Sequence, residues 1–182
     1  PFVPEGAGPR AGAGGVVGSA GRRGSRLSHI SARRSADGGA TWEPEMLLSR
    51  FPRNAPGDLH ARPQLLSDGG NQLWAYWVGV RNTRSSVFLN RSADGGKTWT
   101  EPQAITGDSR SVFAATMLRA GGRMLLVWHD TFGGEPDRIF SATSADGGAT
   151  WTAPVRADHL PPGAPAATSV TALLAPDGEA LV

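Results

Sequence analysis

The stretch SADGGATW at residues 35–42 recurs as SADGGKTW at residues 92–99 and again as SADGGATW at residues 144–151. The copies begin 57 and 52 residues apart. A period near 50 residues is typical of propeller blades and similar repeat arrays. The repeat therefore predicts a protein built from copies of one structural unit.

Each copy of the motif is expected to form a tight hairpin turn. Glycine adopts a positive φ at little steric cost, and an aspartate carboxylate accepts backbone N–H bonds across a turn. The tryptophan is a large apolar anchor that can pack against neighbouring strands. We therefore expect a structural role and not a catalytic one. The residues concerned are Ser35, Asp37, Gly38, Gly39, Thr41, Trp42, Ser92, Asp94, Gly95, Gly96, Thr98, Trp99, Ser144, Asp146, Gly147, Gly148, Thr150 and Trp151.

The residues around each motif predict four short strands per unit. They are rich in branched and aromatic residues, are separated by Gly-containing turns, and show no helical periodicity. Four antiparallel strands in about 50 residues describe a propeller blade, so the fold class is all-β. The predicted strands are 15–20, 27–34, 45–48, 62–66, 72–80, 86–91, 103–105, 112–118, 123–131, 138–143, 155–156, 166–174 and one that begins at 179.

The repeat also predicts how the chain is divided. Blade 1 is expected at residues 1–53, blade 2 at 54–107, blade 3 at 108–159 and part of a fourth blade at 160–182. At about 50 residues per blade, a complete propeller needs several more units. We therefore expect the 182 residues to be a piece of a larger propeller.

Composition narrows the functional classes. The chain has no cysteine, which excludes disulfides and thiolate chemistry, and its four histidines lack metal-ligand spacing. The net charge is +2, and the arginines are scattered, so no nucleic-acid partner is expected. No apolar run is long enough to span a membrane. No glycine pattern opens a helix as a nucleotide loop would, and we expect no cofactor and no metal.

The motif S-x-D-G-G-x-T-W resembles the Asp-box, or BNR repeat, of the sialidase superfamily. The resemblance covers most of the chain and implies a six-bladed propeller with the box between the third and fourth strands of a blade. It further implies a glycosidase or a related binding protein whose partner is a glycan or glycoprotein. Secretion, or a place at the cell surface or in the periplasm, is expected by the same analogy.

Strand order predicts which end of the blades carries function. In an up-and-down blade the motifs share one end with the connections between first and second strands. The other end carries the variable connections at residues 21–24, 81–84 and 130–138 and the links between blades at 50–61, 106–111 and 158–165. Because functional residues favour variable loops on a rigid frame, we expect the site at this second end. The resemblance implies the same end.

The resemblance also implies a catalytic set of three arginines, an acid/base aspartate and a Tyr–Glu nucleophile pair. Arg22 or Arg23 matches the second arginine, which follows the second strand of the first blade. The R-I-P triplet that carries the first arginine is absent, and no acid follows Arg23 closely. The single tyrosine, Tyr76, lies in a strand core sequence and is expected to pack. The complete set is therefore not visible in this chain.

Other residues at the second end are the remaining candidates. Asp130, with Glu135 and Asp137, forms a carboxylate cluster that could hydrolyse a glycoside or hold a cation, and Asp130 is the candidate catalytic residue. The alternative is that Asp130 and Asp137 cap the loop and pair with Arg138. The candidate substrate-binding residues are Arg22, Arg23, Arg62, Arg81 and Asp137.

Three functions remain open from the sequence. The first is a sialidase-like exo-glycosidase that removes terminal sialic acid or a related sugar, with its catalytic set incomplete here. The second is a non-catalytic propeller that binds glycans or proteins. The third is an architectural repeat in a larger surface protein.

Overall fold

The computed structural model describes residues 14–21, 28–50, 59–81, 83–107, 111–130, 138–159, 161, 171–175, 177 and 179–182. Every regular element within these residues is a β-strand, as the sequence predicted. The strands are β1 (Gly14–Gly21), β2 (Ser28–Ser35), β3 (Met46–Leu47), β4 (Leu59–Ser67), β5 (Leu73–Arg81), β6 (Arg84–Ser92), β7 (Gln103–Ala104), β8 (Val112–Ala120), β9 (Arg123–Asp130), β10 (Arg138–Ser144), β11 (Val155–Arg156), β12 (Leu173–Leu174) and β13 (Ala180–Leu181).

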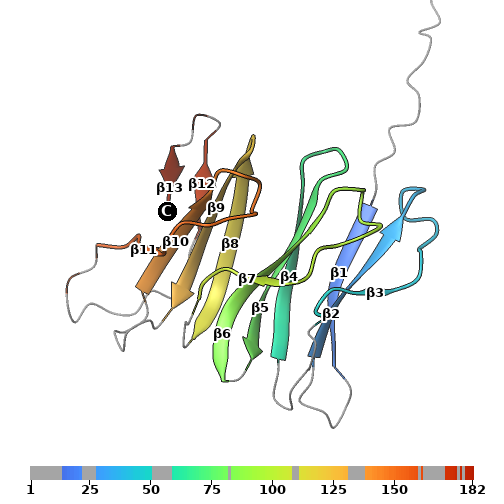
Figure 1. Cartoon of the computed structure of the whole chain (residues 1–182), viewed down its shortest axis with the longest axis horizontal. Coiled ribbons are helices and arrows are strands. Elements are labelled where there is room, and N and C mark those ends of the chain that lie inside the picture. Colours follow the sequence, from blue (N-terminus) through green and yellow to red (C-terminus); the bar gives the residue numbers. More distant parts are fainter. Residues whose placement is uncertain are drawn as a thin grey trace, which may run out of the picture.

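The strands form consecutive antiparallel sheets, each in sequence order (Figure 1). We call β1–β3 blade 1, β4–β7 blade 2 and β8–β11 blade 3, and β12 pairs with β13 in a further hairpin. Blades 2 and 3 have the predicted four strands, and the motif follows the third strand in each. The blade boundaries at 53/54, 107/108 and 159/160 stay predictions.

Most predicted strands differ from the observed ones by one or two residues at an end, and two differ by more. β4 begins at Leu59 and not at residue 62, because residues 59–61 pair with residues 78–80 of β5. A register shift between Ala61 and Gln64 lets the strand continue past Pro63. The first strand of the fourth unit is Leu173–Leu174, shorter than the predicted 166–174, whose residues 166–170 lie outside the described part.

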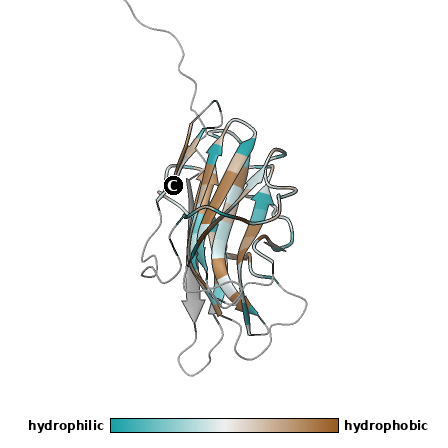
Figure 2. Ribbon diagram, turned by 90° about the vertical axis from the view of Figure 1, so that its left-hand side faces the viewer, coloured by the Kyte–Doolittle hydropathy of each residue, from teal (hydrophilic) through white to brown (hydrophobic). Residues whose placement is uncertain are grey.

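The central strands of blades 2 and 3 are buried on both faces, which explains their nearly continuous apolar sequences. Side chains alternate along β5: Trp74 and Tyr76 join a core shared with blade 3, whereas Ala75 and Trp77 join a core shared with blade 1. Hydrophobic residues follow the strand interiors in Figure 2. The blades are therefore stacked sheets that share their cores.

Hydrogen bonds also join neighbouring blades. The indole N–H of Trp74 donates to the Gly147 carbonyl of blade 3 at 2.8 Å. The backbone N–H of Met117 donates to the Tyr76 hydroxyl at 3.3 Å. Burial raises the pKa of the Tyr76 phenol, and the hydroxyl lies inside the core shared with blade 3. Tyr76 is thus a packing residue, as the sequence predicted.

The three motifs, called the repeat turns below (residues 35–42, 92–99 and 144–151), share one hydrogen-bond pattern. In the second turn Ser92 Oγ donates to Asp94 Oδ1 at 2.8 Å, and Asp94 Oδ2 accepts from Thr98 Oγ1 at 2.6 Å. Asp94 Oδ1 also accepts from the Thr98 N–H at 2.9 Å. Matching bonds recur in the other two turns.

Glycine is required in these turns for two reasons, which Gly148 illustrates. Its φ is +84°, a region that other residues enter at a cost. A Cβ there would also lie 3.0 Å from Leu89 Cδ2 of blade 2. The third turn therefore packs closely against the neighbouring blade.

The two ends of the blades differ. The repeat turns lie at one end, together with the β4–β5 and β8–β9 hairpins (upper edge in Figure 1). We call this the turn end. The opposite end, called the loop end, carries the β5–β6 hairpin, the close of β9 and the start of β10. The candidate residues at positions 62, 81 and 130 lie toward the loop end.

Candidate functional site

Among the described residues, every buried histidine, aspartate or arginine side chain lies at the loop end, whereas the buried Tyr76 packs in the middle of β5. His60 is the second residue of β4, His129 and Asp130 close β9, and Arg138 opens β10. Their exposed fractions are 2%, 5%, 1% and 2%. Burying ionisable groups is costly, so their concentration at one end of a fold marks a candidate functional site.

Asp130 and Arg138 stand opposite each other in the register of β9 and β10. Asp130 Oδ2 accepts a hydrogen bond from the Trp128 indole N–H at 3.3 Å. Nε and Nη1 of Arg138 are buried without a hydrogen-bond acceptor in the part of the chain that the structure describes. A buried guanidinium is stable only beside negative charge, and Asp130 is the acidic residue that the strand register places opposite Arg138.

Burial limits what Asp130 contacts in this structure. The side chain is 1% exposed, and its Oδ2 accepts the Trp128 indole N–H. A structural role beside Trp128 accounts for both observations, and the catalytic role of Asp130 stays a prediction.

His60 closes the loop end of the core that blade 2 shares with blade 1. The Trp77 indole N–H donates to His60 Nδ1 at 3.2 Å, so this ring nitrogen is an acceptor and carries no proton. The imidazole meets Trp77 and Phe88 edge to face, with ring centroids 6.3 and 5.9 Å away. Gly79 makes this possible, because a Cβ at residue 79 would lie 2.4 Å from His60 Nδ1.

His129 and Phe113 form the aromatic part of the loop end. Their ring centroids lie 5.9 Å apart. His129 is buried, whereas Phe113 is 49% exposed although it belongs to β8. A register shift between Val112 and Ala114 places Phe113 at a β-bulge. An exposed phenyl ring on a rigid strand can stack on the apolar face of a ligand ring.

The structure describes three of the candidates from the sequence. Arg62 is exposed in β4, Arg81 is half-buried as the last residue of β5, and Asp130 is buried at the end of β9. Arg22, Arg23 and Asp137 lie outside the described residues, and so does Glu135.

Sequence reasoning missed Phe113 and His129 and gave Arg138 only the role of a pairing residue. The polar ending of β9, in which His129 and Asp130 follow an apolar run, was a usable signal for His129. No local signal distinguishes Phe113 from a packed strand residue, because its exposure depends on the register shift.

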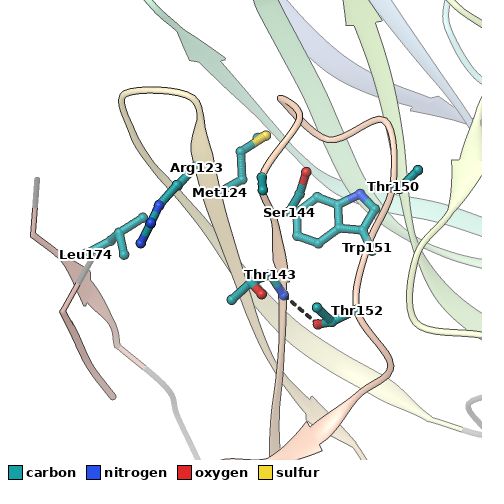
Figure 3. Close-up of a pocket in the computed structure, with 9 residues that line it drawn as sticks. Arg123, Met124, Thr143, Ser144, Thr150, Trp151, Thr152 and Leu174 are labelled. Atoms are coloured by element: carbon teal, nitrogen blue, oxygen red, sulfur yellow. Dashed lines mark hydrogen bonds between the residues drawn. The ribbon is translucent and has the colours of Figure 1, made fainter. Parts of the chain in front are cut away.

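A pocket of about 400 Å³ lies at the turn end and not at the candidate site (Figure 3). Arg123, Met124, Trp151 and Leu174 are among the residues that line it, and the Thr143 N–H donates to Thr152 Oγ1 at 3.0 Å in its wall. Among the described residues of that lining, Arg123 is the only ionisable one. The pocket lies between blade 3 and the β12–β13 hairpin, and its described lining holds no carboxylate and no histidine.

The repeat-turn carboxylates are ionised and held in place. Hydrogen bonds from Thr41 and Ser35 hold the pKa of Asp37 well below its usual range, and Asp94 and Asp146 are affected in the same way by their own turns. A carboxylate fixed by several donors is a poor proton donor near neutral pH. In the described part of the chain, no three His, Asp or Glu residues gather as a metal site, and no helix has the length and apolarity to cross a membrane.

Stacked four-stranded antiparallel blades with a polar loop end define a sialidase-type β-propeller. The family model described as a BNR repeat-like domain matches residues 15–182, and the chain belongs to that family. No curated protein matches the chain.

Solved structures support the same fold. The NanB sialidase from Streptococcus pneumoniae (K499G mutant) is similar with a TM-score of 0.51 and 23% identity over 73% of this chain and 20% of that one. The GH93 α-L-arabinofuranosidase of Fusarium graminearum, solved with arabinobiose, is similar with a TM-score of 0.51 and 17% identity over 70% of this chain and 40% of that one. The intramolecular trans-sialidase from Ruminococcus gnavus is similar with a TM-score of 0.51 and 18% identity over 73% of this chain and 27% of that one. The chain spans between a fifth and two fifths of the length of these proteins.

Proposed function

We propose that this protein acts on glycans at the loop end of its blades, as a sialidase-like exo-glycosidase. The observation that carries the proposal is the placement of the buried histidine, aspartate and arginine side chains, all of which lie at the loop end in the described chain. Similar solved structures belong to glycoside hydrolases with the same propeller fold, and this likeness supports glycans as the substrate class. Fold alone does not carry function, so the loop-end residues are the test.

The described residues have separate roles in this proposal. Asp130 and Arg138 are assigned as positioning residues, because both are buried and stand opposite each other in the register of β9 and β10. Phe113 offers an exposed ring to a sugar, and Arg62 and Arg81 offer guanidinium groups. Most glycoside hydrolases place two carboxylates about 5–10 Å apart on either side of the bond, whereas a sialidase-like set uses one acid/base carboxylate and a Tyr–Glu pair. Glu135 and Asp137 are the acids that follow Asp130 most closely in the sequence.

A binding protein without turnover is the second candidate. The sequence favours it through two features, the absence of an R-I-P triplet and the absence of an acid shortly after Arg23. Both candidates place the glycan at the loop end, so one set of variants tests them together.

The experiment uses the protein with all residues that its reading frame encodes. Turnover is measured on fluorogenic sialosides and α-L-arabinofuranosides, and binding is measured on an oligosaccharide panel. We expect Asp130→Asn to reduce turnover or affinity about tenfold or more, because the substitution removes a buried negative charge from the residue opposite Arg138. Asp68→Asn is the matched control, since Asp68 accepts backbone bonds in the β4–β5 hairpin at the turn end.

The outcomes separate the candidates. If the wild type turns over a substrate and Asp130→Asn reduces that turnover, the result supports the glycosidase. If the wild type binds oligosaccharides without turnover, the result supports the binding protein. Equal behaviour of Asp130→Asn and Asp68→Asn, with both variants folded by circular dichroism, contradicts a site at the loop end.

A further inference from the structure

The second repeat turn departs from the other two at one position. Lys97 stands where the first and third turns carry Ala40 and Ala149, and it is the only lysine of the chain. Two residues before the turn, blade 2 has Asn90 where blade 3 has Ala142. Both departures line the same pocket, which lies between blades 1 and 2. Because the other turns form without these side chains, the side chains are candidates for a function of their own.

This pocket, called the rim pocket below, has a volume of about 350 Å³, at the small end of the range for ligand sites. Leu48 and Asn90 are each 1% exposed, whereas Lys97, Thr100 and Glu101 are exposed. The rim pocket therefore has a buried floor and a polar, open mouth. Its lining consists of Met46, Leu47, Leu48 and Arg50 from blade 1 and of Asn90 and residues 97–101 from blade 2.

The floor holds a hydrogen-bond acceptor without a donor. Asn90 Nδ2 donates to the Leu48 carbonyl at 3.0 Å, across the boundary between the blades. This bond fixes the orientation of the amide, since the oxygen of the amide cannot stand opposite a carbonyl. Asn90 Oδ1 is buried, and no donor reaches it from the part of the chain that the structure describes. Proteins rarely leave a buried oxygen of this kind unsatisfied, so the floor is suited to a ligand O–H or N–H.

The walls add a donor and an aromatic surface. Thr100 Oγ1 accepts the Arg91 N–H at 3.0 Å, which leaves the hydroxyl proton of Thr100 as a donor. The Trp99 indole N–H already donates to the Gly96 carbonyl at 3.1 Å, so the ring contributes aromatic carbon surface. A sugar ring has hydroxyl groups at its edge and an apolar C–H face. The donor, the acceptor and the aromatic ring of the rim pocket match these features.

The charge at the mouth narrows the kind of sugar. Lys97, Arg50 and Glu101 are exposed there, and none of the three forms an ion pair among the described residues. Two cations and one acid leave the mouth with a net positive charge. The ammonium of lysine is a compact point charge with rotatable donors, which suits a tetrahedral anion, whereas a planar carboxylate is matched best by the arginine fork. Sulfate and phosphate esters are tetrahedral anions of this kind.

From these blade-specific residues we propose that the rim pocket binds a sugar unit that carries a sulfate or phosphate ester. Asn90 Oδ1 accepts a hydrogen bond from a sugar hydroxyl, and Trp99 packs against the ring. Lys97 and Arg50 bind the ester at the mouth. The rim pocket shares no lining residue with the loop end, so this site goes beyond the proposed function: it anchors a substituted glycan and does not react with it.

An NMR titration of the protein with all residues that its reading frame encodes tests the proposal. The probes are N-acetylglucosamine 6-sulfate, N-acetylglucosamine 6-phosphate and unsubstituted N-acetylglucosamine, assayed apart from the oligosaccharides used for the loop end. We expect at least one ester to shift the side-chain amide signals of Asn90 and the indole N–H signal of Trp99. That ester should bind about tenfold more tightly than the parent sugar, the difference that a charged hydrogen bond supplies. The tighter of the two esters identifies the anion.

Matched variants separate binding from folding. Lys97→Ala gives the second turn the sequence of the other two, so it should fold normally and lose the preference for the ester while it keeps its affinity for the parent sugar. Glu101→Gln should raise the affinity for the ester alone, because it removes a like charge from the mouth. Asn90→Ala should weaken both sugars. Arg123→Ala, which removes a cation from the pocket beside Trp151, is the control and should change neither affinity.

Three results would overturn the proposal. They are the absence of any shift at Asn90 and Trp99 with either ester, equal affinity for the esters and the parent sugar, and an unchanged preference for the ester in Lys97→Ala. None of these results bears on the loop end, whose turnover and binding are tested through Asp130. The proposed function and the rim pocket therefore stand or fail separately.

Discussion

Asp37, Asp94 and Asp146 each accept a threonine hydroxyl and backbone N–H groups within a single turn. These bonds favour the ionised carboxylate and hold its pKa below the ordinary value of 3.8. The same chemistry in all three turns explains why Ser, Asp, Gly and Thr recur at fixed positions. At the residue scale, the repetition thus reflects turn geometry and not catalysis.

The lowered pKa values predict the pH dependence of stability. Because the folded-state pKa lies below the unfolded one, the stabilisation is complete above about pH 4 and is lost as the pH falls toward the folded-state pKa. Asp94→Asn should lower the melting temperature at pH 7 and make its fall below pH 4 shallower than in the wild type. Thermal unfolding monitored by circular dichroism from pH 7 to pH 2 checks this, and parallel curves for both proteins would contradict it.

At the element scale, the loop end of β5 is shaped by a close approach between strands. Gly79 faces His60 of β4 and Phe88 of β6, and an added Cβ would lie 2.4 Å from His60 Nδ1 and 2.9 Å from Phe88 Cε2. Both neighbours are buried, so neither can move away freely. The position of the His60 ring therefore depends on the presence of glycine, with no side chain, at residue 79 of the adjacent strand β5.

Gly79→Ala should destabilise the protein by about 1–3 kcal/mol, the usual cost of overpacking a core. Urea unfolding measures the change in the free energy of unfolding. Gly122→Ala is the control, because a Cβ at residue 122 meets no atom within 4 Å and should change stability by less than about 0.5 kcal/mol. Equal effects of the two substitutions would show that the approach of His60 to β5 is not tight.

The same elements show what the sequence could predict. The repeat turns and the strands beside them were predictable, because turn chemistry and apolar runs are local signals. The exposure of Phe113 was not, since a bulge shifts the alternation by which strand faces are assigned. The burial of Asp130 and Arg138 was also hidden, because burial is a tertiary property that the polar sequence at the ends of these strands does not indicate. The left-handed backbone of Arg62 lies at the register shift beside Pro63 and has no local signal either.

On the scale of the whole molecule, the described chain is a stack of similar blades with unlike ends. The turn end is closed by three nearly identical hairpins, in which the aspartates are engaged by their own turns. The loop end collects the buried histidine, aspartate and arginine side chains and the bulged residues Arg62 and Phe113. A repeated frame at one end and varied side chains at the other separate stability from recognition.

Hydrogen–deuterium exchange with and without a saturating oligosaccharide tests this division most directly. The ligand is the oligosaccharide of the binding panel that the wild-type protein binds most tightly. We predict protection in peptides that cover residues 59–63, 81–84, 111–115 and 128–138, with the repeat turns unchanged. Protection confined to residues 35–42, 92–99 or 144–151, or to the pocket around Trp151, would place the ligand at the turn end and contradict the proposed site.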